Sequence, residues 1–448
     1  METLKSYNPA SGEYIGEVRK TELSEIESIV RKSQEAQIIW ADLTIDDRIK
    51  IIDKASKKVI NNKDRISTLL HREMGKSLRS AESEVLSCSY SIHTAQLVKN
   101  AIAPQVLSGH GIETIVNYNP LGVCAIISPW NYPVSMAHWM IIPALTAGNS
   151  VILKPSEETP LVAQAYVDAL NEELPPNVLQ IVQGGDEQGN ELVISDGVAF
   201  IGFTGSREVG KKIMSNAAGT FKRVILELGG KDSLIVLKDA DIEQAARFAI
   251  ANSLENAGQM CISTERIFVD ATIADDFKKQ LINYMQRYNM GANSDQPVIG
   301  PIINANQRER ILNQMQDALS KGANIIYRGA VYPEQYISPM ILDNITDEMQ
   351  IAKEETFGPI VCLSTFDNVE DAINSTNSTG FGLSGVVYGH KNVEKVALQL
   401  QVGMIGINSG VGGIGDTPWV GAKQSGYGYH GSPDGHRQFT QVQVITKQ

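Results

Sequence analysis

Hydrophobic and polar positions divide the chain into a helical first part and an alternating remainder. From Leu23 to about Leu107, apolar residues recur at helical spacing, and Ile26 and Val30 fall on one face of a predicted helix. From Val123 onward, short runs rich in Val, Ile and Leu end in glycine or proline and alternate with helical segments. This alternation predicts a buried parallel sheet of the α/β class.

A second alternating series follows Asp239 and predicts a second α/β unit, with a crevice between the two units near residues 227–240. Two further strand-like segments, ETIVNYNP (113–120) and VQVITKQ (442–448), have no partner within their own unit. Such segments are edge strands, and we expect them to pair with each other or with another subunit.

Composition narrows the class of protein. The chain has 448 residues, 42% hydrophobic and 20% charged, with a net charge of −12, enough for two or three folded domains. No block is dense in lysine or arginine, so no nucleic-acid partner is expected. No apolar run is long enough to span a membrane, and METLKSYNPASGEY lacks the apolar core of a signal peptide. We therefore expect no membrane partner and a cytoplasmic location. Four scattered cysteines and seven histidines show no metal-ligand spacing, so no metal is expected.

One cysteine, Cys261, follows a predicted helix at a loop that precedes a strand. Gly258 and Gln259 come before it, and Ser263 and Thr264 come after it. A lone cysteine is more often a small buried hydrophobic residue than a nucleophile. Catalytic residues concentrate on such loops, however, so both interpretations stay open on these residues alone.

Two polar residues lie in apolar surroundings. Glu227 lies inside the predicted strand RVILELGG, where burying a carboxylate is unfavourable without a role or a partner. It is a candidate general base, and the alternative is a buried ion pair with Lys231. Asn131 lies between Trp130 and Tyr132 in SPWNYP, where a side-chain amide suits a developing oxyanion. The alternative is that this aromatic stretch is plain core.

Two loops that follow predicted strands are candidates for nucleotide binding. VAFIGFTGSREVGKKI is a strand, a glycine-rich turn and a helix that Ser206 can cap, and the helix amides suit a phosphate. Its glycine spacing matches neither G-x-G-x-x-G nor a P-loop. In SVILKPSEETP, Lys154 ends a strand, and Glu157 could accept hydrogen bonds from ribose hydroxyls. The alternatives are an ordinary strand–helix turn and a solvated pair of loop residues.

Together these motifs resemble the aldehyde dehydrogenase superfamily. The resemblance covers nearly the whole chain and rests on seven motifs in the family order, namely PWNYP, KPSEETP, FTGSREVG, ELGGK, GQMC, EETFGP and KQSGYG. It implies an α/β fold with a Rossmann-like nucleotide-binding domain (1–101 and 121–229) and an α/β catalytic domain (230–430). It also implies a small β-strand oligomerisation arm (102–120 and 431–448) and a homodimer or homotetramer.

The resemblance implies the NAD(P)-dependent oxidation of an aldehyde to the carboxylic acid. Cys261 matches the nucleophile that forms a thiohemiacetal and then a thioester. Asn131 matches the side chain that holds the oxyanion with the Cys261 backbone amide, and Glu227 matches the base that activates water. NAD is favoured over NADP, because Glu157 would repel a 2′-phosphate. The implied cofactor contacts are Trp130, Lys154, Glu157, Gly205, Ser206, Leu228, Glu355 and Phe357.

The sequence departs from the family near the substrate pocket. The common PFGGxKxSGxGRE is PWVGAKQSGYGYH here, so that Trp419 and Val420 replace Phe and Gly. Two positions that often carry arginine in succinate-semialdehyde dehydrogenases hold Trp139 and Glu255, and a carboxylate repels an anionic substrate. We therefore expect an uncharged aliphatic or aromatic aldehyde, or an aminoaldehyde such as betaine aldehyde. The expected pocket residues are Trp139, Glu255, Tyr132 and Met136.

Three alternatives remain. The first is a succinate-semialdehyde dehydrogenase in which Arg437 or His436 supplies a positive charge. The second is a coenzyme-A-dependent acylating enzyme, which Glu227 disfavours because such enzymes tend to lack this glutamate. The third is a catalytically silent structural protein of the same fold, like the lens crystallins of the family, which the intact Asn131, Glu227 and Cys261 disfavour.

Overall fold

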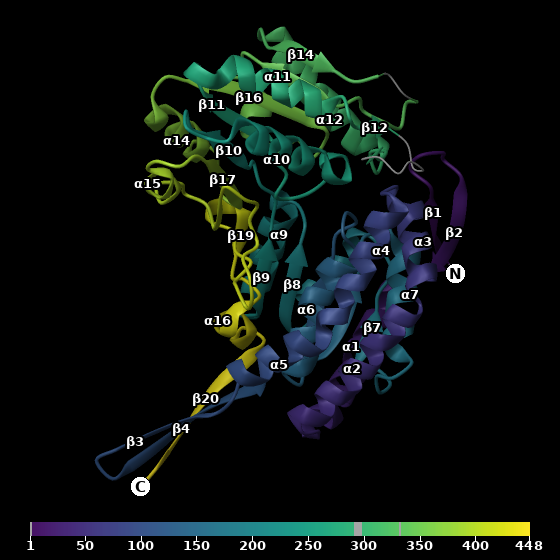
Figure 1. Cartoon of the computed structure of the whole chain (residues 1–448). Coiled ribbons are helices and arrows are strands. Elements are labelled where there is room, and N and C mark those ends of the chain that lie inside the picture. The colour runs from purple at the N-terminus through teal and green to yellow at the C-terminus, as the bar shows by residue number, and fades with distance from the viewer. Residues whose placement is uncertain (1, 291–297, 331–332) are drawn as a thin grey trace.

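The computed structural model describes residues 2–290, 298–330 and 333–448, and two parallel-rich sheets form its core (Figure 1). The six-stranded sheet has the order β19-β9-β8-β5-β6-β7, and the seven-stranded sheet has the order β14-β15-β16-β11-β10-β17-β18. Both sheets have helices packed on them, so the expected α/β class is confirmed.

The six-stranded sheet is buried on both faces. Its bounds are β5 (Val123–Ile127), β6 (Ser150–Lys154), β7 (Leu179–Ile181), β8 (Val198–Thr204), β9 (Arg223–Glu227) and β19 (Gly426–Tyr427). Strands β5 to β9 run parallel, and β19 joins β9 antiparallel. In β5, Cys124 and Ile126 pack into one core cluster, whereas Val123, Ala125 and Ile127 pack into another. Burial on both faces explains the continuous apolar runs in the sequence.

Two groups of helices cover this sheet. On one face lie α2 (Ile45–Asn61), α3 (Lys63–Met74), α4 (Leu78–Leu86), η1 (Ser87–Tyr90), α5 (Ser91–Ala101), α6 (Ser135–Thr146) and α7 (Pro160–Asn171). On the other lie α8 (Asp186–Ile194), α9 (Arg207–Ala218) and the first turns of α1 (Leu23–Asp42). The helical first part of the chain therefore serves to bury the sheet.

The seven-stranded sheet is built in the same way. Its bounds are β10 (Ser233–Val236), β11 (Arg266–Asp270), β14 (Asn324–Arg328), β15 (Met340–Asp343), β16 (Ile360–Phe366), β17 (Ser384–Tyr388) and β18 (Met404–Ile407). One face packs on α10 (Ile242–Leu254), α11 (Ala274–Met285), α12 (Ala305–Ser320) and α13 (Gln350–Lys353), and the other on α14 (Val369–Asn377) and α15 (Val393–Ala397). The remaining short elements are η2 (Glu255–Gly258), η3 (Ala271–Ile273), η4 (Lys423–Ser425), α16 (Ser432–Arg437), β12 (Asn289–Met290) and β13 (Val298–Ile299).

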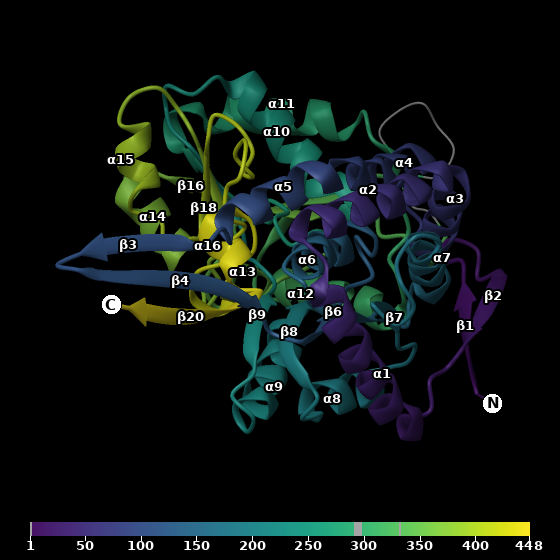
Figure 2. The ribbon, with the colours of Figure 1, turned by 90° about the horizontal axis from the view of Figure 1, so that it is seen from below.

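A three-stranded antiparallel sheet projects from the body of the molecule (Figures 1 and 2). It contains β3 (Gln105–Gly109), β4 (Ile112–Pro120) and β20 (Thr440–Lys447), in the order β20-β4-β3. The two predicted edge segments thus pair with each other within one chain. The expectation of helix up to Leu107 was wrong, because Leu107 lies in β3. It is exposed, so its apolar side chain carried no information about helical burial.

An amino-terminal hairpin was not predicted. It consists of β1 (Thr3–Tyr7) and β2 (Tyr14–Arg19), which pair antiparallel. Each strand buries a single residue, Ser6 in β1 and Val18 in β2, so the sequence lacks the regular apolar alternation of a half-buried strand. Among the residues that the structure describes, no helix is long and apolar enough to cross a lipid bilayer.

Candidate active site

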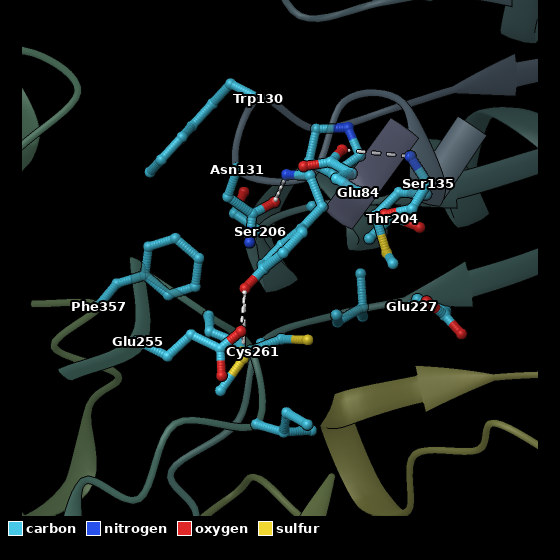
Figure 3. Close-up of a pocket in the computed structure, with 18 of the residues that line it drawn as sticks. Glu84, Trp130, Asn131, Ser135, Thr204, Ser206, Glu227, Glu255, Cys261 and Phe357 are labelled. Atoms are coloured by element: carbon cyan, nitrogen blue, oxygen red, sulfur yellow. Dashed lines mark hydrogen bonds between the residues drawn. The ribbon is translucent and has the colours of Figure 1, made fainter. Parts of the chain in front are cut away.

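A pocket of about 490 Å³ is lined by residues of both α/β units (Figure 3). A second cleft, of about 580 Å³, lies at the ends of β5, β6 and β8 and beside the start of α9. The two cavities share the lining residues Pro129, Trp130, Thr204, Gly205 and Ser206, so they adjoin each other. Such a space at the carboxyl ends of parallel strands is where α/β folds bind ligands.

The structure brings every predicted site residue to one of these two cavities. The pocket contains Cys261, Glu227, Asn131, Trp130, Gly205, Ser206, Leu228, Glu355, Phe357, Trp139, Glu255, Tyr132 and Met136. The cleft contains Lys154 and Glu157, together with the shared Trp130, Gly205 and Ser206.

Cys261 lies on a loop whose backbone is unusual. Asn256 and Ala257 have φ of 53° and 59°, and Gly258 has φ of 73°. A Cβ on Gly258 would overlap the carbonyl oxygen of Gly358, so glycine is required for this close backbone contact. The contact joins the loop that carries Cys261 to the EETFGP loop.

The surroundings of Cys261 favour the protonated thiol over the thiolate. Burial raises the pKa of the thiol well above its usual value, and the charge of Glu227 raises it further. The side chain is nevertheless partly exposed to the pocket, whereas the other three cysteines are buried. Cys261 is therefore accessible and needs a positive charge or a base nearby before it can react.

Asn131 is held firmly in its orientation. Its side-chain Nδ2 donates to the Gln259 carbonyl at 3.0 Å, and its Oδ1 accepts from the Tyr132 backbone N–H at 3.1 Å. A side-chain amide carries two N–H groups, so one of them stays available for a ligand atom. The amide nitrogen is thus fixed while it keeps a donor for the pocket.

A buried ion pair between Lys76 and Glu84, which sequence reasoning missed, fixes the backbone of Asn131. The Lys76 Nζ donates to Glu84 at 2.6 Å and to the Asn131 backbone carbonyl at 2.8 Å. The other oxygen of Glu84 accepts from the N–H groups of Val134 (3.0 Å) and Ser135 (3.2 Å) at the start of α6. Both side chains are nearly inaccessible. In the sequence, Lys76 and Glu84 appear only as two charged residues in a predicted helical stretch. Exposed helix positions carry charged residues of the same kind, so the sequence does not show that this pair is buried.

Glu227 has a different partner from the one considered in the sequence. Lys231 pairs instead with Glu265 and donates to Thr356. It lies between β9 and β10, and Glu265 directly precedes β11, the neighbour of β10 in the seven-stranded sheet. The Nε2 of His430 lies 2.7 Å from Glu227 Oε1, and both side chains are buried. The carboxylate is turned away from Cys261 and toward the C-terminal segment (Figure 3).

The unusual C-terminal segment forms one wall of the pocket. Trp419 and His430 form an isolated antiparallel bridge, and the rings of both lie 5.6 Å from that of Trp139. The two residues considered as anion partners do not line the pocket. Arg437 donates to the Ala101 carbonyl at 2.9 Å, and His436 lies 2.9 Å from Asp416. The expectation that either could face the substrate was wrong, because both are used to pack α16.

The substrate side of the pocket carries negative charge. Tyr132 donates through its hydroxyl to Glu255 at 3.0 Å, and Glu255 is exposed at the pocket wall. Arg310 is the one cationic side chain among the described residues that line the pocket, and it donates to the Glu355 carbonyl at 2.8 Å. This cation therefore belongs to the EETFGP loop and not to the wall formed by Trp139 and Glu255.

The cleft fits a dinucleotide. Ser206 caps α9 by accepting from the Val209 N–H, as expected, and Ser206 and Val209 line the cleft, where the free amides of a helix start suit a phosphate. Lys154 lies 3.4 Å from Glu157 at the far end. At the pocket end, Phe357 contacts Trp130 edge-on at 5.5 Å.

Glu355 also lies at the pocket end of this space. Its Oε1 accepts from the Gly230 N–H at 3.0 Å. Burial, followed by the charge of Glu265, raises the pKa of Glu355 to about 7. A carboxylate here suits the hydroxyls of a ribose.

Nowhere in the described ranges do three or more His, Cys, Asp or Glu side chains gather so as to hold a metal ion. The parallel sheet, the nucleotide-sized cleft and the adjoining cysteine pocket are typical of a nucleotide-dependent oxidoreductase.

Comparison with known proteins gives the family. The model of the aldehyde dehydrogenase family matches residues 1–445. The chain is 35% identical to succinate-semialdehyde dehydrogenase, mitochondrial, of Arabidopsis thaliana, over 99% of this chain and 86% of that protein. It is 32% identical to succinate-semialdehyde dehydrogenase [NADP(+)] GabD of Escherichia coli (strain K12), over 99% of this chain and 94% of that protein. A crystal structure of aldehyde dehydrogenase from Brucella melitensis biovar abortus 2308 superposes with a TM-score of 0.94 at 35% identity, covering 99% of this chain and 94% of that chain.

The chain belongs to the aldehyde dehydrogenase family. The expected family, its fold and the NAD(P)-dependent oxidation of an aldehyde are confirmed.

Proposed function

We propose that Cys261, Asn131 and Glu227 carry out this oxidation in two steps, acylation and deacylation of the cysteine. The observation that carries the proposal is that all three side chains line one pocket, which adjoins the proposed dinucleotide cleft. The roles come from the family resemblance and from the chemistry of each side chain.

In the first step, the Cys261 thiol gives its proton to water, the resulting thiolate adds to the aldehyde carbon, and the carbonyl electrons move to oxygen. The free N–H of Asn131 and the Cys261 backbone amide stabilise this oxyanion. An oxidised nicotinamide cofactor bound in the cleft would supply the hydride acceptor and a positive charge that favours the thiolate. As the hydride leaves, the C=O bond forms again and a thioester remains on Cys261.

In the second step, Glu227 removes a proton from water, and the water oxygen adds to the thioester carbon. The C–S bond then breaks, the electrons return to sulfur, and the carboxylic acid leaves. In the orientation observed, Glu227 faces His430, so its side chain must turn toward Cys261 before this step.

NAD is the proposed cofactor. A ribose 2′-phosphate near Glu157 would meet a carboxylate, and like charges repel. NADP is the second candidate, because Lys154 and Lys212 line the same cleft and the Escherichia coli relative is named for NADP(+). The ratio of kcat/KM for the two cofactors decides between them, and Glu157→Gln should raise the value for NADP.

The proposed substrate is an aldehyde whose far end is apolar, aromatic or cationic. The wall opposite the cofactor consists of Trp139, Trp419, Tyr132 and Glu255, which suits rings, alkyl chains and cations. The second candidate is succinate semialdehyde, on which the named relatives act. A distal carboxylate would need a cation that this wall lacks among the residues described.

One assay tests these proposals together. NADH formation is followed by absorbance with hexanal, benzaldehyde, betaine aldehyde and succinate semialdehyde, each with and without coenzyme A. Cys261→Ser should fold, bind NAD and lose turnover by several orders of magnitude. Near-normal turnover in that variant contradicts the nucleophile assignment. A clear preference for succinate semialdehyde contradicts the substrate proposal, and a requirement for coenzyme A contradicts hydrolysis.

We also propose that the chain is organised as the resemblance implies, with nucleotide-binding, catalytic and arm parts. The arm sheet exposes the apolar side chains Val106, Leu107, Val442, Val444 and Ile445, which supports a homodimer or homotetramer built through it. Light scattering that shows a stable monomer at micromolar concentration contradicts this assembly.

A further inference from the structure

The contact between His430 and Glu227 is buried beside the pocket, which Glu227 lines and His430 does not. The two side chains are only 9% and 8% exposed. His430 is held in place by its backbone bridge to Trp419 and by the Trp139 ring. A polar contact in such surroundings is stronger than one at the surface.

The two ends of Glu227 are held very differently. Its backbone is fixed, because the carbonyl accepts from the Gly205 N–H at 3.0 Å and the residue pairs with Gly426. At the tip, Oε1 lies 2.7 Å from His430 Nε2 but makes no well-aligned hydrogen bond with any described residue. The carboxylate is thus retained by one short, bent contact, from which it can turn away.

We infer that His430 is a positioning residue that holds the Glu227 carboxylate away from Cys261 until the thioester has formed. The inference rests on the proposed roles of Glu227 and Cys261. In this orientation the carboxylate leaves the space beside the sulfur to the aldehyde and the nicotinamide. Its negative charge also stays farther from the sulfur, where it would oppose the thiolate.

The expected effect of His430→Leu follows directly. Without the contact, the carboxylate turns toward the pocket and obstructs the first step. The burst of NADH formation should slow about three- to tenfold, because the lost contact is short but less well aligned than a full hydrogen bond, while thioester hydrolysis does not slow. Rapid-mixing absorbance measures both rates.

Two further variants separate positioning from a general structural effect. His430→Gln keeps an N–H donor near the Nε2 position and should restore most of the burst rate. His436→Gln is the matched control, because His436 is buried in the same segment but contacts Asp416 and not Glu227. It should leave the burst rate unchanged.

Alkylation of Cys261 by iodoacetamide gives a second, independent measurement on the enzyme without cofactor. The other three cysteines are buried and should react slowly. The charge of Glu227 already raises the pKa of the Cys261 thiol, so its closer approach in His430→Leu should slow alkylation severalfold. In a Glu227→Gln background, His430→Leu should have no effect on alkylation.

The outcomes are distinct. Unchanged burst and alkylation rates in His430→Leu overturn the inference, as does an equal slowing in His430→Leu and His436→Gln. If His430→Leu does not fold, His430→Asn, whose amide is too short to reach Glu227, replaces it with the same expected results. Full turnover in Glu227→Gln alone contradicts the proposed base instead. A stalled Glu227→Gln enzyme together with a wild-type-like His430→Leu contradicts only the inference about His430.

Discussion

Asn131 and Glu227 lie on opposite walls of one pocket, and the protein holds them in opposite ways. Asn131 is fixed through Gln259 and through the buried pair of Lys76 and Glu84. The Glu227 Oε1 lies 2.7 Å from His430 Nε2 and makes no well-aligned hydrogen bond among the described residues. The Asn131 amide, which must already be in position when the oxyanion forms, is rigid. The Glu227 carboxylate, which acts only after the thioester has formed, is held by fewer contacts and can change its orientation.

The largest effect is expected from a substitution of Glu227, the less firmly held of the two residues. Glu227→Gln should lower steady-state turnover about 10²- to 10⁴-fold, the usual contribution of a general base. It should keep a burst of about one NADH per site, because water activation follows hydride transfer. The burst amplitude also counts the folded sites. Loss of the burst would mean that Glu227 activates Cys261, and the contrast between the two walls would fail.

Breaking the ion pair of Lys76 and Glu84, which supports Asn131, should mainly lower the stability of the protein. Lys76→Met leaves Glu84 buried without its partner, which should decrease the free energy of unfolding by about 3–5 kcal/mol. Adding Glu84→Gln removes the unpaired charge and should recover part of this loss. Chemical denaturation measures both variants. A single variant as stable as the wild type would show that the pair does not support this wall.

Removing the amide of the rigid side should affect only the first step. Asn131→Ala should slow the burst about 10²- to 10³-fold, the usual effect of losing one oxyanion donor. Asn256→Gly is the control for the loop, since the Asn256 amide donates to the Gln259 carbonyl at 3.2 Å and to the Asn131 backbone carbonyl at 3.3 Å but does not line the pocket, and glycine tolerates the φ of 53° at this position. Equal slowing in both variants would assign the effect to the loop and not to the oxyanion.

The smallest expected effect concerns Glu355, another carboxylate that lines the pocket. Its Oε1 accepts from the Gly230 N–H. Burial and the charge of Glu265 raise its pKa to about 7. It therefore becomes a full acceptor for ribose hydroxyls as the pH rises from about 6 to about 8, and KM for NAD should fall about three- to tenfold over that interval. Glu355→Gln should remove this dependence. A flat profile in the wild type would contradict the assignment.

The sequence predicted those parts whose signal is local. Strands buried on both faces appear as continuous apolar runs. Ser206 follows such a strand, and Cys261 lies on the loop between a helix and the next strand. The amino-terminal hairpin was missed, because each of its strands buries only one side chain. Leu107 was misassigned because an exposed arm strand does not need the periodicity of a core.

The partners of the buried charges could not be predicted. Glu227 was compared with Lys231, its neighbour in sequence, yet its partner is His430, far along the chain in the segment that departs from the family. Lys76 and Glu84 look like any two charges on a helix until folding buries them under Asn131. Pairing of this kind depends on tertiary packing, which no short window of sequence contains.

The backbone contact between Gly258 and Gly358 has a consequence for how sequences of this fold can change. A Cβ at Gly258 would overlap the Gly358 carbonyl, and a Cβ at Gly358 would overlap the Ile311 side chain. A single substitution at either glycine therefore requires neighbouring atoms to shift. We expect both positions to change rarely during evolution, at the point where the cysteine loop meets the EETFGP loop. Libraries aimed at a new substrate should therefore leave these two glycines fixed and vary Glu255 and Met136, which line the pocket.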